Sequence, residues 1–349
     1  MQDAAPNKQA IHPWVAEGLQ KIRVGIHFLD NGVDWKRFSD AAQAAEELGY
    51  DSIWVPDHPA LLPDCWGQLG ALAAITRTLR LGTFVDCIFF RHPLSLARVA
   101  GDVDRWSGGR LVLGLGIGDL SFEFGMFNMP FLSTRERQNA LEETIQILRG
   151  VWETPPFSYT GKHFQVQNAA LAFGPVQQPY IPLLIAGGGE RVTLRQVAQY
   201  ADASNFGPHM HTGGAASMED VVRKSHVISD HCATFGRPGE AILRTHTVLP
   251  LLLGKTQEAA EAKRETMPPE MRGFFESGTI ATTVDGAIAY YNALVQAGMQ
   301  YFIIGIAPGD LETMQMFKEQ VFPALTQGKE ALPIAQIAAR NPHNRQNLS

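Results

Sequence analysis

Short apolar segments alternate with amphipathic ones along most of the chain, and this alternation constrains the fold more than any other feature. The apolar segments are predicted strands at residues 22–28, 52–55, 80–87, 110–118, 182–188, 203–206, 301–306 and within 242–253. Between them, apolar residues recur every three or four positions, as in helices that cover a core. Most of the strands are unbroken apolar runs, which are typical of parallel strands buried on both faces. The sequence therefore predicts an α/β protein with a parallel sheet.

Eight strands separated by helices favour a closed (β/α)8 TIM barrel, and a chain of 349 residues is long enough to form one. The alternative is an open, doubly wound sheet, in which a glycine-rich dinucleotide fingerprint follows the first strand. No glycine-rich segment follows residues 22–28. The nearest string, GLGIGD at 114–119, follows the fourth strand and has Asp119 in place of the third glycine. We therefore expect the barrel.

Three segments interrupt the repeat of strand and helix. Residues 119–134 follow the fourth strand and are rich in Phe and Met, residues 265–283 follow the seventh strand, and a hairpin is predicted within 154–181, before the fifth strand. Insertions that follow barrel strands lie at the carboxyl ends of the strands, where barrels keep their active sites. The predicted organisation is an N-terminal extension, the barrel and a C-terminal tail, at residues 1–21, 22–327 and 328–349.

Charge and cysteine content argue against several classes of protein. A net charge of −6 without a basic stripe argues against a nucleic-acid partner. The three cysteines include no CxxC pair and suit a reducing compartment better than a disulfide framework. The N-terminus lacks the features of a signal peptide, and no apolar run approaches the roughly 18 residues that span a bilayer. We expect a soluble cytoplasmic protein without a membrane partner.

Polar side chains gather where predicted strands end. Asp57 and His58 directly follow the second strand, between Pro56 and Pro59, and Asp119 follows the fourth strand. At a barrel mouth, a histidine can hydrogen-bond a cofactor or transfer a proton near neutral pH. The alternative roles are a loop histidine with satisfied hydrogen bonds and carboxylates that cap turns. Their position favours function, so Asp57, His58 and Asp119 are the candidate catalytic residues.

The segment GGGERVTLR, residues 187–195, is the clearest ligand-binding pattern. Three glycines allow backbone amides to approach an anion, and a helix predicted to begin near Glu190 adds its positive end. Arg191 can add a charge-assisted contact. The pattern predicts a phosphate site; the alternative is a plain glycine-rich turn between strand and helix. The two histidines of PHMH, at 208–211, lack a third ligand in register, so no metal site is predicted.

Several segments together resemble the bacterial luciferase-like superfamily of flavin- and deazaflavin-dependent oxidoreductases. They are SIWVPDH (52–58), RLGTFVDCIFFRHPLSLAR (80–98), DRWSGGRLVLGLGIG (104–118), IPLLIAGGGERVTLRQVAQYAD (181–202) and AGMQYFIIG (297–305). The similarity covers residues 22–327, and the family fold is a β/α barrel. The resemblance implies an oxidoreductase that binds its cofactor across the barrel mouth.

The resemblance also assigns roles to the strand ends. The turn at 187–189 is similar to the family's cofactor-phosphate site. The segment 83–86 is similar to the one behind the isoalloxazine-type ring, where members often have a non-proline cis peptide. Asp57 and His58 look like a pair that lies near the ring, and Asp119 stands where one branch has an acid and many relatives have a Trp. The candidate cofactor-binding residues are Asp57, His58, Thr83, Phe84, Val85, Asp86, Gly116, Gly118, Ala186, Gly187, Gly188, Gly189 and Arg191.

The glycine-rich turn most resembles members that use coenzyme F420, a deazaflavin. FMN is the alternative, because both cofactors carry a ribityl phosphate. A deazaflavin passes a hydride, whereas reduced FMN supports monooxygenation. In the favoured mechanism the substrate lies under residues 119–134, and His58 or Asp119 handles the proton that accompanies the hydride. Hydrophobic residues of the insertions favour a small apolar or aromatic substrate; they are Phe122, Phe124, Met126, Phe127, Phe274 and Phe275.

Further expectations concern partners and activity. The resemblance implies a homodimer and allows a separate flavin or F420 reductase as a partner. A non-catalytic flavin-binding protein is the remaining alternative, because a fold and a cofactor site do not guarantee a reaction. The presence of Asp57, His58 and Asp119 at the predicted mouth favours an enzyme.

Overall fold

Eight parallel strands close into a barrel in the computed structural model, which describes residues 11–30, 32–208 and 212–326. In barrel order they are β1 (Arg23–Phe28), β2 (Ser52–Val55), β3 (Arg80–Thr83), β5 (Leu111–Gly116), β8 (Leu183–Ala186), β9 (Ala203–Phe206), β10 (Leu243–Gly254) and β12 (Tyr301–Ile306). Parallel pairing of β12 with β1 completes the ring. This closure confirms the predicted TIM barrel and rules out the open sheet.

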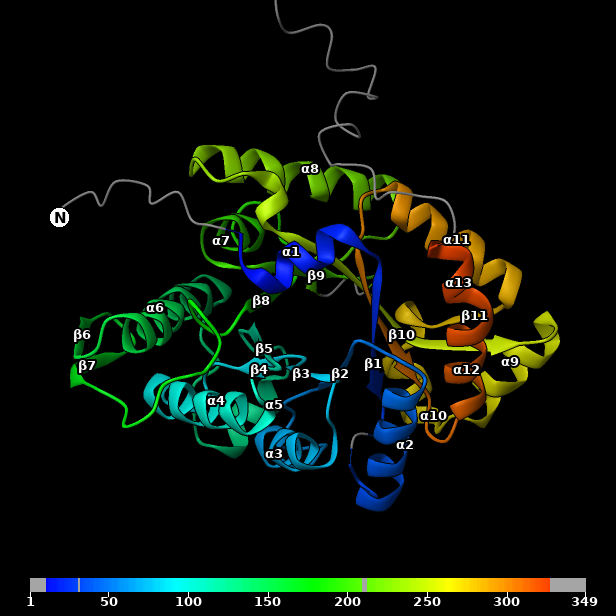
Figure 1. Cartoon of the computed structure of the whole chain (residues 1–349), viewed down its shortest axis with the longest axis horizontal. Coiled ribbons are helices and arrows are strands. Elements are labelled where there is room, and N and C mark those ends of the chain that lie inside the picture. Colours follow the sequence, from blue (N-terminus) through cyan, green and yellow to red (C-terminus); the bar gives the residue numbers. More distant parts are fainter. Residues whose placement is uncertain (1–10, 31, 209–211, 327–349) are drawn as a thin grey trace, which may run out of the picture.

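Helices surround the barrel (Figure 1). They are α2 (Trp35–Glu47), α3 (Cys65–Ile75), α4 (Pro93–Ser107), α6 (Thr134–Glu153), α7 (Thr193–Tyr200), α8 (Met218–Thr234), the 3₁₀ turn η2 (Gly239–Ala241), α11 (Val284–Gln296), α12 (Leu311–Met316), the π-helical turn η4 (Phe317–Val321) and α13 (Phe322–Thr326). Local signals mark both limits of α2: Asp34 accepts a hydrogen bond from the N–H of Arg37, and Gly49 follows the helix with a φ of +74°.

Along each strand, successive side chains alternate between facing the surrounding helices and facing the barrel interior. In β1, Val24, Ile26 and Phe28 belong to the large apolar cluster that includes helix residues, so Gly25 and His27 face inward. Ile26 is completely buried, and burial of such a side chain contributes about 1.5–3 kcal/mol. The alternation places His27 near the carboxyl end of β1, inside the barrel mouth.

Helix α1 (Pro13–Gln20) lies across the amino-terminal end of the barrel (Figure 1). Trp14 is buried and packs edge-on against Tyr301, the first residue of β12. The guanidinium of Arg23 lies 5.5 Å from the ring centroid of Trp14 and 5.1 Å from that of Tyr301. Part of the segment predicted as an N-terminal extension thus covers this end, and the carboxyl end is the barrel mouth.

The three insertions fold into short elements. After β5 comes α5 (Ser121–Met126), and the predicted hairpin is formed by β6 (Phe157–Thr160) and β7 (Gln165–Ala169). After β10 come α9 (Gln257–Thr266), α10 (Pro269–Phe274), the 3₁₀ turn η3 (Glu276–Gly278) and β11 (Ile280–Thr283). Strand β11 pairs in parallel with the last four residues of β10. The sequence of this insertion shows no clear period because most of its elements are too short to display one.

The strand predicted at 80–87 is interrupted. It consists of β3 and of β4 (Asp86–Cys87), and the peptide bond between Phe84 and Val85 that separates them is cis. A non-proline cis peptide in this segment is what the resemblance implies, and the structure confirms it. After the interruption, β4 pairs in parallel with the end of β5.

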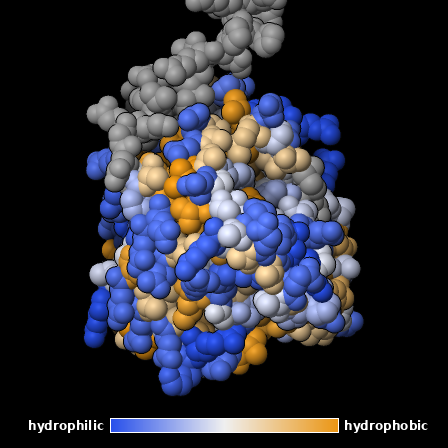
Figure 2. Space-filling model, turned by 90° about the vertical axis from the view of Figure 1, so that its right-hand side faces the viewer, coloured by the Kyte–Doolittle hydropathy of each residue, from blue (hydrophilic) through white to orange (hydrophobic). Residues whose placement is uncertain are grey.

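The surface is mixed on the side of α9, α11 and α12, which Figure 2 faces: hydrophilic residues dominate it, and hydrophobic residues form smaller groups between them. None of the described helices combines the length and the hydropathy that a membrane span requires. His209 and His211 of the PHMH segment and the predicted tail at 328–349 lie outside the described residues.

Candidate active site

The carboxyl ends of β2, β3, β5 and β8 bring most of the predicted site residues to one mouth. These four strands are consecutive neighbours in the ring. Asp57 and His58 follow β2, and the glycine turn at 187–189 follows β8. The N–H of Phe84 donates to the carbonyl of Val55 at 2.7 Å, which holds the cis segment beside the end of β2. The expected grouping of these ends is therefore present.

His58 is held by Glu123, a residue of α5. The Nδ1 atom of His58 lies 3.1 Å from Oε2 of Glu123, whose Oε1 accepts a hydrogen bond from the N–H of Ala60 at 3.3 Å. The side chain of His58 is 28% exposed, whereas that of Glu123 is 3% exposed. A buried carboxylate thus fixes the imidazole ring and leaves part of it accessible at the mouth.

The surroundings raise the pKa of His58 above its ordinary value. Burial lowers the pKa, but the hydrogen bond to Glu123 and the negative charges of Glu123, Asp119 and Asp57 outweigh burial. His58 therefore keeps its proton to a higher pH than a histidine in water. Because Nδ1 is bonded to Glu123, the N–H at Nε2 is the donor that remains for a ligand.

Asp57 belongs to a group of charged side chains beneath the mouth. Its carboxylate accepts a hydrogen bond from Arg91 at 2.7 Å, and Arg91 also contacts Asp86 at 3.3 Å and binds Asp64. We call these four residues the ionic cluster. Asp57 and Asp86 are 5% and 0% exposed, so the charge of Arg91 is needed to keep them stable in the interior. The cluster joins the loop after β2 to β4 and α3, and thereby positions His58.

Asp86 is the most deeply buried member of the ionic cluster. One oxygen accepts a hydrogen bond from Nε1 of Trp66 at 2.7 Å, and the other has no partner among the described residues. Burial and the charge of Asp57 raise the pKa of Asp86, and Arg91 offsets this only in part. The Sγ atom of Cys65 and one carboxylate oxygen each of Asp57 and Asp86 lie within 4.8 Å of one another. Arg91 supplies the positive charge of this group.

Small residues make room for the cis segment. A Cβ atom on Gly116 would lie 2.5 Å from Cγ2 of Val85. Thr83 is buried, and its hydroxyl donates to the carbonyl of Gly114 at 2.7 Å. The structure therefore uses Gly116 and the Thr83 side chain for packing within the barrel. Phe84 and Val85 are half-buried, and they are the residues of this segment that offer an apolar surface to a ligand.

Helix α5 has one packed face and one exposed face. It follows Gly118 and the exposed Asp119. Gly118 has a φ of +73°, and a Cβ atom there would lie 2.7 Å from the Phe124 ring. Phe124 is buried and contacts the rings of Phe89, Phe90 and Phe131. In the insertions after β5 and β10, the exposed large hydrophobic residues are Phe122, Met126, Phe127, Phe131 and Phe274. Such a division suits a lid that is anchored on one side and covers an apolar ligand on the other.

The glycine turn after β8 has the geometry of an anion site, with one correction. Helix α7 begins at Thr193, and not near Glu190, because the residues in between form a turn. Gly187 has a φ of +113°. A Cβ atom on Gly188 would lie 2.2 Å from the carbonyl oxygen of Gly213. Two of the three glycine N–H groups are already used: that of Gly187 donates to the carbonyl of Asn205 at 2.9 Å, and that of Gly188 donates to the carbonyl of Thr212 at 3.0 Å. The N–H of Gly189 and the start of α7, which has no side-chain cap at Val192, are left for an anion.

Charged residues around this turn also favour an anion. Lys224 of α8 donates to the carbonyl of Gly188 at 2.7 Å and lies 3.3 Å from Glu190. Arg223 contacts Glu190 at 3.0 Å, so two cations neutralise the acid of the turn. Arg191 is exposed and adds positive charge. The half-buried residues of the turn are Ala186, Gly187, Gly189 and Glu190.

The side of the mouth formed by β1, β10 and β12 is apolar. Leu29, Leu249 and Ala307 are buried there in one cluster, against which Phe84 and Phe275 pack. The cluster reaches from the cis segment to the insertion after β10, so this insertion contributes apolar groups near the mouth. We call this cluster the apolar wall.

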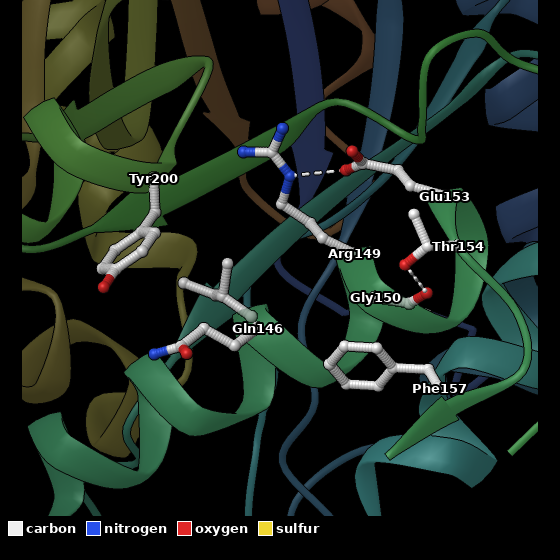
Figure 3. A pocket seen from close by; sticks show the side chains of 8 residues that line it. Gln146, Arg149, Gly150, Glu153, Thr154, Phe157 and Tyr200 are labelled. Atoms are coloured by element: carbon white, nitrogen blue, oxygen red, sulfur yellow. Dashed lines mark hydrogen bonds and ion pairs between the residues drawn. The ribbon is translucent and has the colours of Figure 1, made fainter. Parts of the chain in front are cut away.

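A cavity of about 310 Å³ lies away from the mouth, between α6, β6 and the end of α7 (Figure 3). Its lining includes Gln146, Arg149, Phe157 and Tyr200, and Arg149 donates to Glu153 at 2.8 Å. None of the candidate residues lines it. The candidate catalytic residues, among them His58 with its raised pKa, lie at the mouth instead.

Sequence reasoning did not single out Glu123, His27, Arg91 or Lys224. Glu123 stands among aromatic residues in SFEFGM (121–126), and an acid in such a setting is a usable signal. His27 has a signal too, because the apolar residues on both sides of it mark the opposite face of the strand. Nothing in the sequence pairs Arg91 or Lys224 with their partners.

Comparisons with known proteins show the family of the chain. The sequence profile of the luciferase-like monooxygenase family matches residues 19–300. A protein named F420-dependent glucose-6-phosphate dehydrogenase, from Amycolatopsis mediterranei (strain U-32), is 26% identical over an alignment of 315 residues, which covers 81% of this chain and 92% of that protein. Two solved structures share the fold. Coenzyme F420 dependent tetrahydromethanopterin reductase from Methanopyrus kandleri has a TM-score of 0.74 and 20% identity, over 88% of this chain and 100% of that one.

The second is a monooxygenase from Streptomyces bottropensis, with a TM-score of 0.73 and 21% identity, over 86% of this chain and 99% of that one. These two structures show the same fold as this chain. The family profile covers most of the barrel, from α1 to the residue before β12. The chain therefore belongs to the luciferase-like monooxygenase family, the family that its sequence segments resemble.

Proposed function

We propose that this protein is an oxidoreductase that binds the deazaflavin coenzyme F420 at the barrel mouth and transfers a hydride to or from a small organic substrate. The observation that carries the proposal is the His58–Glu123 pair, a proton-holding group at the same mouth as the uncapped glycine turn. The relative named an F420-dependent dehydrogenase supports the choice of cofactor.

The residues at the mouth fit such a cofactor. Its phosphate would be held by the N–H of Gly189, by the start of α7 and by Arg191. Its ring would lie against Phe84 and Val85, whose half-buried side chains offer an apolar surface. When bound, the deazaflavin supplies the group that accepts or gives up a hydride.

The chain's own residues would manage the proton and the solvent. His58 donates from Nε2 to a substrate oxygen and takes the proton back in the reverse direction. Glu123 and the exposed Asp119 keep His58 charged, and the ionic cluster fixes its loop. The exposed face of α5 covers the substrate and excludes water. An apolar or aromatic substrate suits this lid and the apolar wall. A homodimer in the cytoplasm and a reductase that recycles the cofactor complete the proposal.

The test is a titration of the apo-protein with F420 and with FMN, followed by fluorescence. We expect saturable binding of F420 and much weaker binding of FMN. Tight binding of FMN without affinity for F420 would reverse the choice and indicate an FMN-dependent monooxygenase. Stopped-flow oxidation of the reduced cofactor, with and without a panel of carbonyl compounds, then separates an enzyme from a protein that only binds the cofactor.

A further inference from the structure

His27 lies at the floor of the mouth, and the proposed proton transfer does not use it. It faces the barrel interior and pairs in register with Gly305 of β12, which has no side chain to compete for the space. Its ring centroid lies 5.9 Å from that of Phe84, in the segment proposed to support the cofactor ring. Only 5% of His27 is exposed.

One hydrogen bond decides how the two ring nitrogens of His27 are used. Nδ1 lies 3.1 Å from the carbonyl oxygen of Trp54, and because a carbonyl only accepts, Nδ1 carries the proton. Burial lowers the pKa of His27 to about 4, and this outweighs the opposite effect of the bond to Trp54. The ring is therefore neutral near pH 7 and has a lone pair at Nε2.

The Nε2 atom is available to a ligand. It has no hydrogen-bond partner among the described residues. It is also absent from the set of polar atoms that are both completely buried and without a partner, so part of its surface is accessible. Phe84, the ring neighbour of His27, packs against the apolar wall. A ligand that fills this part of the mouth displaces water from Nε2, so a ligand without a donor leaves this acceptor unsatisfied.

We propose that Nε2 of His27 accepts a hydrogen bond from a hydroxyl group of the substrate, so that the enzyme favours alcohols over molecules of the same shape without a hydroxyl. The proposal rests on the proposed function for the location of the substrate. The two histidines then divide the recognition: His58 donates to an oxygen, whereas His27 accepts from a hydroxyl. An N–H of the cofactor ring is the other donor that could reach Nε2, and the experiment separates the two.

The experiment compares 1-methylcyclohexanol with methylcyclohexane as ligands of the F420-loaded enzyme. The alcohol is tertiary and has no carbinol hydrogen, so it binds without being oxidised. We expect it to bind about fivefold to tenfold more tightly than the hydrocarbon, because its hydroxyl donates to His27 and accepts from His58. In His27→Asn the amide can still donate to the carbonyl of Trp54, but the acceptor at the Nε2 position is lost. We expect the preference to fall by about threefold there, since the bond from His58 remains, with the affinity for F420 unchanged.

Two controls make the result decisive. His27→Gln places an amide oxygen near the Nε2 position, and we expect it to regain part of the preference. In the wild type, the ¹⁵N signal of Nε2 should shift when the alcohol is added and not when the hydrocarbon is added, which needs no variant to fold. An unchanged preference in His27→Asn, or an unmoved signal, would overturn the proposal.

The remaining outcomes separate this proposal from the proposed function. A loss of F420 affinity in His27→Asn would assign Nε2 to the cofactor and overturn the assignment to the substrate. Failure of the wild type to bind F420 would overturn the proposed function. In that case the same pair of ligands is titrated into the apo-protein, where a preference that depends on His27 supports the proposal and its absence overturns it.

Discussion

The neighbouring strands β1 and β2 each deliver a histidine to the same mouth, and the two side chains differ in charge and role. His27 bonds only a backbone carbonyl beside the apolar wall, and its pKa is lowered to about 4. His58 bonds a buried carboxylate, and its pKa is raised. The comparison shows that surroundings, and not residue type, decide which histidine accepts and which donates. Groups whose surroundings push their pKa values apart are suited to different steps of one reaction.

The largest effect is expected from removing the charged histidine. His58→Ala should lower kcat by about 10²–10⁴-fold, the range for loss of a general acid or base, while the fold is retained. Steady-state kinetics and circular dichroism measure the two quantities. Added imidazole should restore part of the rate, which a merely structural role would not predict. Unchanged kcat in this variant would remove His58 from the mechanism.

The next largest effect concerns the ionic cluster that supports His58. Arg91→Met leaves Asp57 and Asp86 buried without their shared cation, so the free energy of unfolding should fall by about 3–5 kcal/mol. Urea denaturation measures this loss. Adding Asp86→Asn removes one of the two buried negative charges that Arg91→Met leaves without a cation. The double variant Arg91→Met with Asp86→Asn should therefore regain part of the free energy of unfolding. A loss below about 1 kcal/mol, the range of a surface ion pair, would contradict a buried cluster.

A smaller effect is expected in the pH dependence. Glu123→Gln removes the carboxylate that raises the pKa of His58, so the loss of activity on the alkaline side should move to lower pH. The same linkage acts on stability. The raised pKa stabilises the wild type fully below the ordinary pKa of histidine, and this stabilisation is lost as the pH rises through the raised value. The variant should therefore be less stable mainly at low pH. Identical pH profiles of kcat/KM would show that Glu123 does not set this pKa.

The smallest effect is expected at the glycine turn, which is independent of both histidines. Arg191→Ala should weaken the binding of F420 by about fivefold and leave kcat unchanged, because an exposed charge contributes little. Arg195→Ala is the matched control, since this exposed arginine of α7 lies over the Phe235 ring, 5.1 Å from its centroid. Fluorescence titration measures both variants. Equal affinities in the two would exclude a contact between Arg191 and the phosphate.

The barrel could be predicted from the sequence because its signals are local. Apolar runs mark the strands, and residues such as Asp34 and Gly49 mark the limits of helices within a few positions of them. The glycine turn at 187–189 is local as well, since three adjacent residues define it. The start of α7 was harder to predict, because a turn and the first turn of a helix have similar composition.

The chemistry of the mouth could not be predicted, because it depends on contacts between distant segments. His58 and Glu123 are 65 positions apart, and no period links them. Asp86 has the sequence position of a residue behind the cofactor ring, yet its carboxylate lies in the ionic cluster because Trp66 and Arg91 bind it. The neutral state of His27 results from burial by other parts of the barrel.

The most direct test of the contrast between the two histidines is a pH titration of the ¹⁵N-histidine protein by NMR, with His27→Asn and His58→Ala to assign the signals. We predict that His58 titrates above the ordinary pKa of about 6.5. We predict that His27 stays neutral down to about pH 4, with its proton on Nδ1. Titration of both rings together near pH 6.5 would contradict the account.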